Sequence, residues 1–212
     1  MTANNKNRWW IRLSLSGIFI FILLFTAAAS LYPGGSYTDH SAKGYSWLHN
    51  YWCDLLSENA KNGLPNSARP VAISAWFVLC ISLSIFWYIL PEKFLISPMH
   101  KKIIRYCGVV AMAIAAVLFT SLHDEVIYLG GIFGSISLVG IFVALQKSKL
   151  YPFFYSGIFC ALLIGINYYI VLTGTQIVLL PLIQKITFAA VLLWIYFICK
   201  RLYWYREDSI ML

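Results

Sequence analysis

The stretch LSLSGIFIFILLFTAAASLY, from Leu13 to Tyr32, decides the fold class. It contains no charged residue, and about 20 apolar residues in a helix suffice to cross the roughly 30 Å hydrocarbon core of a bilayer. Basic residues before this run and the small residues 27–30 near its end also fit a cleavable signal peptide. The apolar run is longer than a signal-peptide core, and Trp9 and Trp10 are typical of an interfacial anchor, which favours a permanent transmembrane helix.

Composition extends this reading to the whole chain. Hydrophobic residues make up 60% and charged residues 11% of the 212 residues, against about 45–50% and about 25% in soluble domains. The sequence therefore predicts an all-α membrane bundle, formed by one domain covering residues 1–212. Besides 13–32, the predicted transmembrane helices are 71–90, 106–122, 126–146, 151–172 and 178–199. Their continuous apolar runs disfavour a β-barrel, whose strands alternate.

The positions of Lys and Arg predict the orientation of these six spans. With a cytoplasmic N-terminus, twelve of the 16 basic residues lie in the cytoplasm, three lie outside, and Lys185 lies in the membrane. This asymmetry is the positive-inside pattern, and it predicts a multi-pass protein of the inner (plasma) membrane with both termini cytoplasmic. The net charge of +8 follows mostly from this topology. Because the chain has no basic run or aromatic-basic platform, a nucleic-acid partner is not predicted.

The outer loop, residues 33–70, is too long for a structureless connection in a compact protein. It opens with a Pro-Gly-Gly turn signal. Between Tyr45 and Glu58 apolar residues recur at helical spacing, which predicts a short amphipathic helix lying in the outer interface. The expected apolar face consists of Trp47, Leu48, Tyr51, Trp52, Leu55 and Leu56.

A polar cluster is expected where the outer ends of the helices meet this loop. His123 and Asp124 lie in the very short turn between the third and fourth spans, and Asp54 lies in the predicted amphipathic helix. An ionisable side chain inside the membrane is costly unless it meets a partner. Lys185 is therefore a binding candidate, with Asp124, Glu125 or Asp54 as possible counter-ions. The alternative is that Lys185 only extends its ammonium to the headgroups.

A metal site is an alternative use of the same cluster. On a helix, His49 and Cys53 would share one face at the i, i+4 spacing, and His123 with Asp124 could complete a mixed zinc site. A zinc-bound water could then attack a lipid ester or amide. The chain has no HExxH motif and no CxxC pair, so no cofactor is predicted and zinc stays an alternative. Serine-hydrolase and phosphate-loop motifs are likewise missing.

Four short segments carry a resemblance to a known family. They are the DLLSE stretch at 54–58, the NSARP stretch at 66–70, His123-Asp124, and the region from Gln184-Lys185 to Trp194. Together they resemble the domain of unknown function 998 family of bacterial six-helix membrane proteins, which is similar in layout to the eukaryotic Frag/DRAM/Sfk membrane proteins. The resemblance covers nearly the whole chain, with Lys185 where the family has an arginine. It implies six helices and no settled activity.

Two functions remain open at this point, and enzymatic activity is undecided. The first is a module that binds, senses or organises membrane lipids or a small solute through Asp54, His49, His123, Asp124 and Lys185. The second is a membrane-embedded hydrolase of a lipid ester or amide at the outer leaflet, with His123, Asp124 and Asp54 as catalytic candidates. The first requires fewer groups that the sequence does not display. The oligomeric state is not predicted, because small-residue stripes within the helices serve internal packing equally well.

Overall fold

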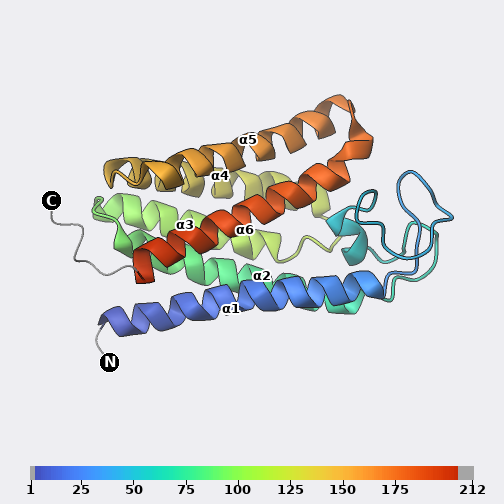
Figure 1. The fold of residues 1–212 in the computed structure, drawn as a ribbon, viewed down its shortest axis with the longest axis horizontal. Helices are drawn as coiled ribbons and strands as arrows, with labels where there is room; N and C mark the ends of the chain where they lie inside the picture. Colours follow the sequence, from blue (N-terminus) through green and yellow to red (C-terminus); the bar gives the residue numbers. More distant parts are fainter. Residues whose placement is uncertain (1–2, 205–212) are drawn as a thin grey trace.

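The computed structural model describes residues 3–204, which form six α-helices and three short 3-10 helices without a β-strand (Figure 1). The predicted all-α class is confirmed. The α-helices are α1 (Ala3–Ser30), α2 (Arg69–Ile89), α3 (Pro98–Ala115), α4 (His123–Lys147), α5 (Tyr151–Thr173) and α6 (Leu180–Trp204). The 3-10 helices are η1 (Trp52–Leu56), η2 (Leu90–Lys93) and η3 (Ile177–Leu179).

Five of the helices are long and apolar enough to cross a membrane. These apolar stretches are Arg8–Ser30, Arg69–Lys93, His123–Lys147, Tyr151–Thr173 and Ile177–Tyr203. Each covers most or all of a predicted span and begins or ends within a few residues of it. Their lengths of 23 to 27 residues correspond to roughly 35–40 Å of helix, more than the hydrocarbon core requires.

The predicted span 106–122 is placed differently. The helix in this region, α3, begins at Pro98 after Ser97, whose hydroxyl accepts a hydrogen bond from the backbone N–H of His100. It ends at Ala115, where the carbonyl accepts a hydrogen bond of 2.7 Å from the Trp76 indole. The helix thus contains three basic residues, Lys101, Lys102 and Arg105, in its first half. For that reason α3 is less apolar than the other five helices.

The helices alternate in direction, and consecutive helices pack together, most extensively α1 with α2, α3 with α4, α2 with α3, and α5 with α6 (Figure 1). The first turn of α1 and the last turn of α6 lie at the same end of the bundle. We call it the basic end, because η2 and the start of α3 bring Lys93, Lys101 and Arg105 there. Glu92 forms ion pairs with Lys101 at 3.4 Å and with Arg105. The chain from 31 to 68, here called the cap segment, lies at the opposite end.

Small residues allow close contacts between these helices. A Cβ atom at Gly17 of α1 would lie 1.9 Å from the Ser82 hydroxyl of α2. A Cβ atom at Gly157 of α5 would lie 2.8 Å from the Trp194 ring of α6. Neither position accepts a larger residue without movement of the neighbouring side chains. Contacts of this kind stabilise helix pairs in lipid, where burial from water contributes little.

The amphipathic helix predicted for 45–58 is not formed. The structure has only the five-residue helix η1, because Tyr51 adopts an extended backbone conformation and its N–H donates to the Asp54 carboxylate instead of to a helical carbonyl. Competition of this kind between side chains and the helical hydrogen-bond pattern is typical of Asp and Asn. Trp47 and Leu48 are 47% and 55% exposed, whereas Leu55 and Leu56 are buried.

Trp52 anchors the cap segment to the bundle. Its ring lies 4.6 Å from that of Phe25 and 6.0 Å from that of Phe21 on α1, and 5.3 Å from that of Phe188 on α6. Its backbone N–H donates to the Gln184 side-chain oxygen at 3.2 Å. The Trp52 ring is therefore packed between α1 and α6, whereas Trp47 and Leu48 are exposed.

Candidate functional site

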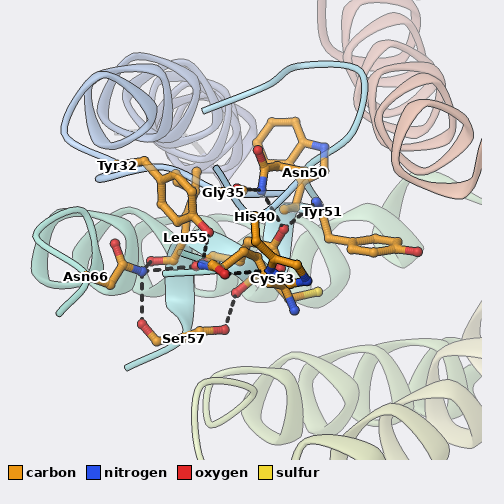
Figure 2. Close-up of polar contacts among 12 residues, drawn as sticks. Tyr32, Gly35, His40, Asn50, Tyr51, Cys53, Leu55, Ser57 and Asn66 are labelled. Carbon is orange, nitrogen blue, oxygen red and sulfur yellow. Dashed lines mark hydrogen bonds and ion pairs between the residues drawn. The ribbon is translucent and has the colours of Figure 1, made fainter. Parts of the chain in front are cut away.

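Asp54 is the centre of the hydrogen-bond network in the cap segment. It is 3% exposed, and its Oδ2 accepts bonds from the Tyr51 backbone N–H at 2.9 Å and the Asn50 amide at 3.0 Å (Figure 2). Its Oδ1 lies 3.5 Å from the Lys61 ammonium. A buried carboxylate is tolerated only with partners of this kind, so these contacts keep η1 in place.

Two asparagines extend the network on either side of Asp54. The Asn50 amide donates to the Gly35 carbonyl at 2.8 Å, and its oxygen accepts from the Ser46 N–H at 2.8 Å. The Asn66 amide reaches three backbone carbonyls at the end of η1, those of Asp54, Leu55 and Ser57, at 2.9–3.2 Å (Figure 2). Asn66 thereby satisfies acceptors that a longer helix would have paired internally.

Tyrosine hydroxyls complete the support of the cap segment. The Tyr45 hydroxyl donates to the carbonyl of Tyr51 at 3.2 Å, and the Tyr32 hydroxyl accepts from the Lys61 N–H at 2.9 Å. Burial raises the pKa of Tyr45 far above its usual value, and the negative charge of Asp54 adds to this effect. Burial likewise raises the pKa of Tyr32. Both hydroxyls therefore stay protonated at neutral pH.

Lys185 contacts the cap segment from α6. Its ammonium donates to the Asn50 carbonyl at 2.5 Å and to the Pro181 carbonyl at 3.0 Å, and it lies 5.6 Å from the centre of the Tyr45 ring. The ion pair of Asp54 is with Lys61, and His123 is the partner of Asp124. The predicted counter-ion is thus replaced by carbonyl oxygens, with Asp54 acting on the ammonium only at longer range.

A cavity of about 890 Å³ opens beside this network. The cap segment, the turns after α3, the start of α4, the end of α5 and the start of α6 all contribute to its wall. The wall contains both apolar and polar residues. The apolar part contains Leu118, Phe119, Ile127, Val171 and Leu180, and the polar part contains Cys53, Asp54, Glu58, Lys61, His123, Asp124 and Gln184.

Three of the five predicted binding residues line this cavity, and the other two do not. Asp54, His123 and Asp124 line it. Lys185 follows the lining residue Gln184 but points to the Asn50 carbonyl. His49 is not among the lining residues, and its ring contacts the Ser46 hydroxyl at 3.2 Å.

His123 is positioned by its neighbours at the first turn of α4. Its Nδ1 lies 3.0 Å from the Asp124 carboxylate. Of the three weak metal candidates, Cys53 and His123 line the same cavity. The third, His49, precedes η1, so the helical i, i+4 relation to Cys53 is not present. Within residues 3–204, no three His, Cys, Asp or Glu side chains form a group that could hold a metal ion.

Two residues that shape the site were not predicted as site residues. Lys61 and Asn66 lie in the outer loop and hold Asp54 and the end of η1. Asn167, at the cavity wall, donates to Thr187 at 2.7 Å, while its buried Oδ1 has no partner among the described residues. A polar residue within an apolar span was the available signal for Asn167.

Comparison with protein-family models, curated proteins and solved structures gave no match to this chain. The residues that carry the family resemblance nevertheless have a clear physical role. Asp54 and Asn66 hold the cap segment together, Arg69 donates from its Nε to the Leu56 carbonyl at 3.1 Å, and His123 with Asp124 lines the cavity.

Proposed function

We propose that this protein binds an amphipathic molecule, a membrane lipid or a compound of similar shape, in the cavity beneath the cap segment. The observation that carries the proposal is the composition of the wall: an apolar part contributed by the turns after α3 and by α4, α5 and α6, and a polar part contributed mainly by the cap segment and the first turn of α4. A ligand with an apolar chain and a polar headgroup matches both parts.

The charges of the wall favour one class of headgroup. Asp54, Glu58 and Asp124 supply three carboxylates, against one ammonium from Lys61 and the imidazole of His123. Asp54 is paired with Lys61, Glu58 with Arg69 and Asp124 with His123, but the Glu58 and Asp124 side chains are 79% and 85% exposed, so their carboxylates remain accessible to a hydrogen-bond donor. We therefore expect an uncharged or amine-bearing headgroup that donates hydrogen bonds, rather than an anionic one.

We further propose six crossings of a bacterial inner membrane, with the basic end in the cytoplasm and the cap segment outside. The proposal rests on the positive-inside rule and on α3, whose 18 residues correspond to roughly 27 Å and are followed by further turns. Membership of the domain of unknown function 998 family is proposed on the segments that carry the resemblance. Cysteine-accessibility labelling of intact cells, with single cysteines introduced at Lys61 and Lys149, tests the orientation: only the first is expected to react from outside.

The experiment for ligand binding uses native mass spectrometry of protein released from nanodiscs that contain equal amounts of phosphatidylethanolamine and phosphatidylglycerol. The matched variants are Ile127→Trp and Ile132→Trp. Ile127 lines the cavity, so a Trp there should fill it, whereas Ile132 lies on another face of α4 and is exposed. We expect phosphatidylethanolamine to be retained by the wild type and Ile132→Trp and to be lost from Ile127→Trp. Equal retention by all three proteins contradicts the proposal, and preferential retention of phosphatidylglycerol contradicts the headgroup class.

The second candidate function is hydrolysis of a bound lipid ester or amide. The observation that favours it is the hydrogen bond between His123 and Asp124 at the cavity wall, because a histidine oriented by a carboxylate is the usual general base of hydrolytic sites.

A further inference from the structure

The cavity beneath the cap segment has exposed apolar residues at one edge. Val171 and Tyr168 of α5 line the cavity, and they are 59% and 41% exposed. Ile127 of α4 lines it as well and is 36% exposed. A residue that faced only into a closed cavity would keep little exposed surface, so Val171 and Tyr168 lie where the cavity opens to the outside of the bundle.

The helices on either side of this edge, α4 and α5, diverge toward the cap segment (Figure 1). They pack together less extensively than any other two consecutive α-helices. Near the basic end, the ring centres of Phe142 and Phe154 lie 5.9 Å apart. Closer to the cap segment, the Tyr168 hydroxyl lies against α4 at Gly131, where a Cβ atom would be 3.1 Å from it. Ile127 is about one helical turn closer still to the cap segment, and there the cavity lies between the two helices.

We call the gap between α4 and α5 on the cap side of the Gly131 contact the side opening, which Ile127 and Val171 border. Both helices are long and apolar enough to cross a membrane. Gly131 lies roughly 12 Å along the axis from the start of α4 at His123, at 1.5 Å per residue. One leaflet supplies about half of the roughly 30 Å hydrocarbon core. In a membrane, the side opening therefore faces the acyl chains of the leaflet on the cap side.

The acidic residues of the same cavity are exposed at the end of the bundle that carries the cap segment. Glu58 and Asp124 line the cavity, and their side chains are 79% and 85% exposed. A lipid in the bilayer has its headgroup at the surface and its acyl chain in the hydrocarbon core, so a sideways movement brings both parts to matching residues. An amphiphile with a long apolar chain is already concentrated in the bilayer, because its chain avoids water. The bilayer is thus the source next to the side opening.

We propose that the ligand of this cavity is a membrane lipid, which enters from the leaflet on the cap side through the side opening, with its acyl chain passing between α4 and α5. The inference deepens the proposed function and rests on it, since it narrows an amphipathic ligand to one taken directly from the bilayer. The side opening must widen as a lipid passes, and the limited packing of α4 against α5 allows that movement.

The test ties α4 to α5 across the side opening with a reversible bridge. Tyr128→Cys and Leu172→Cys are combined, because both residues are exposed, neither lines the cavity, and each adjoins a residue that borders the opening. Bifunctional methanethiosulfonates of graded length bridge the two cysteines in full-length protein that also carries Cys53→Ser and Cys107→Ser. These last substitutions remove the partly exposed native cysteines, and the unbridged protein supplies the reference rate.

Exchange of bound lipid is followed by native mass spectrometry. The protein is bridged in nanodiscs of deuterated phosphatidylethanolamine, and the nanodisc lipid is then replaced by unlabelled phosphatidylethanolamine with cyclodextrin as carrier. We expect the unbridged protein to exchange its bound lipid and the bridged protein to retain the deuterated lipid. Cleavage of the bridge with dithiothreitol should restore exchange, which shows that the protein stayed folded.

Two controls separate closure of the opening from other effects. A matched bridge between Val139→Cys and Leu162→Cys joins exposed positions of the same helices on the basic side of the Gly131 contact and should leave exchange at the reference rate. A monofunctional methanethiosulfonate of equal length, attached to Tyr128→Cys and Leu172→Cys, adds the same bulk without a tie and should also leave exchange unchanged.

The outcomes distinguish the inference from the proposed function. Exchange at the reference rate with the opening bridged means that lipid takes another route, and the inference is wrong while the proposed function stands. An equal block by the matched bridge or by the monofunctional reagent contradicts the inference in the same way, as does failure of every reagent to bridge the two cysteines. If the unbridged protein binds no more phosphatidylethanolamine than Ile127→Trp, the proposed function is wrong as well.

Discussion

Replacing Asp54 tests whether the cap segment is held by the contacts of its carboxylate. Asp54→Ala removes the acceptor of two donors, the Tyr51 N–H and the Asn50 amide, and each buried donor left without a partner costs about 1–3 kcal/mol. The local free energy of opening should therefore fall by roughly 2–6 kcal/mol. Asp54→Asn keeps one acceptor oxygen but loses the charge, which should cost about 1–2 kcal/mol.

Lys61→Ala provides the matched control, because it removes the ion pair of Asp54 and leaves both donors bound. The Lys61 side chain is 39% exposed, and ion pairs with an exposed member contribute about 0.2–1 kcal/mol. Hydrogen exchange of the peptide containing Tyr51, followed by mass spectrometry, measures all three variants on one scale. With about 1.4 kcal/mol for each tenfold change, exchange should accelerate roughly 30-fold to 10⁴-fold in Asp54→Ala and about fivefold at most in Lys61→Ala. Equal acceleration in Lys61→Ala and Asp54→Ala would refute the reasoning.

Three further predictions concern the contacts around this network. Trp52→Ala removes a ring packed against three phenylalanines, so thermal unfolding should show that the free energy of unfolding falls by about 3–5 kcal/mol. Trp47→Ala, at a half-exposed ring, should change it by less than about 1 kcal/mol. Lys185→Met removes the charged donor of the Asn50 carbonyl and should weaken protection of the Tyr51 peptide by about 1–3 kcal/mol in the same exchange assay; no effect would mean that Lys185 only reaches toward the headgroups. In an alkaline titration, the free energy of unfolding should fall as the pH rises above about 10, the usual pKa of Tyr. Burial raises the pKa of Tyr45 in the folded state, so the folded state holds more protons than the unfolded state in this pH range. In Tyr45→Phe the fall should be smaller.

The fold class followed from the sequence where one physical rule dominates. Long uncharged runs such as Leu13 to Tyr32 have no stable alternative to a helix in lipid, because every backbone polar group must be satisfied within the segment. The third predicted span is the exception. The ends of helix α3 coincide with two contacts, the Ser97 cap and the Trp76 bond to Ala115, and hydropathy does not report either of them.

The cap segment could not be predicted in the same way. Its apolar residues follow helical spacing, but the backbone bonds of a helix are replaced by side-chain bonds of Asn50, Asp54 and Asn66. Periodicity shows which residues are apolar, but it does not indicate whether side-chain hydrogen bonds replace those of a helix. The short turn before α4 did indicate that His123 and Asp124 lie at the end of the bundle where the cap segment lies. The partner of Lys185 was missed because carbonyl oxygens have no sequence signature.

The most direct test of the central claim, an amphiphile bound beneath the cap segment, is photo-crosslinking in nanodiscs. A phosphatidylethanolamine that carries a diazirine in its acyl chain is irradiated with the protein, and labelled residues are located by mass spectrometry. We predict preferential labelling of the cavity residues Leu118, Ile127 and Val171, lost in Ile127→Trp and retained in Ile132→Trp. Labelling spread evenly over the exposed residues Leu129, Ile132 and Val139 of α4, with none in the cavity, would contradict the account.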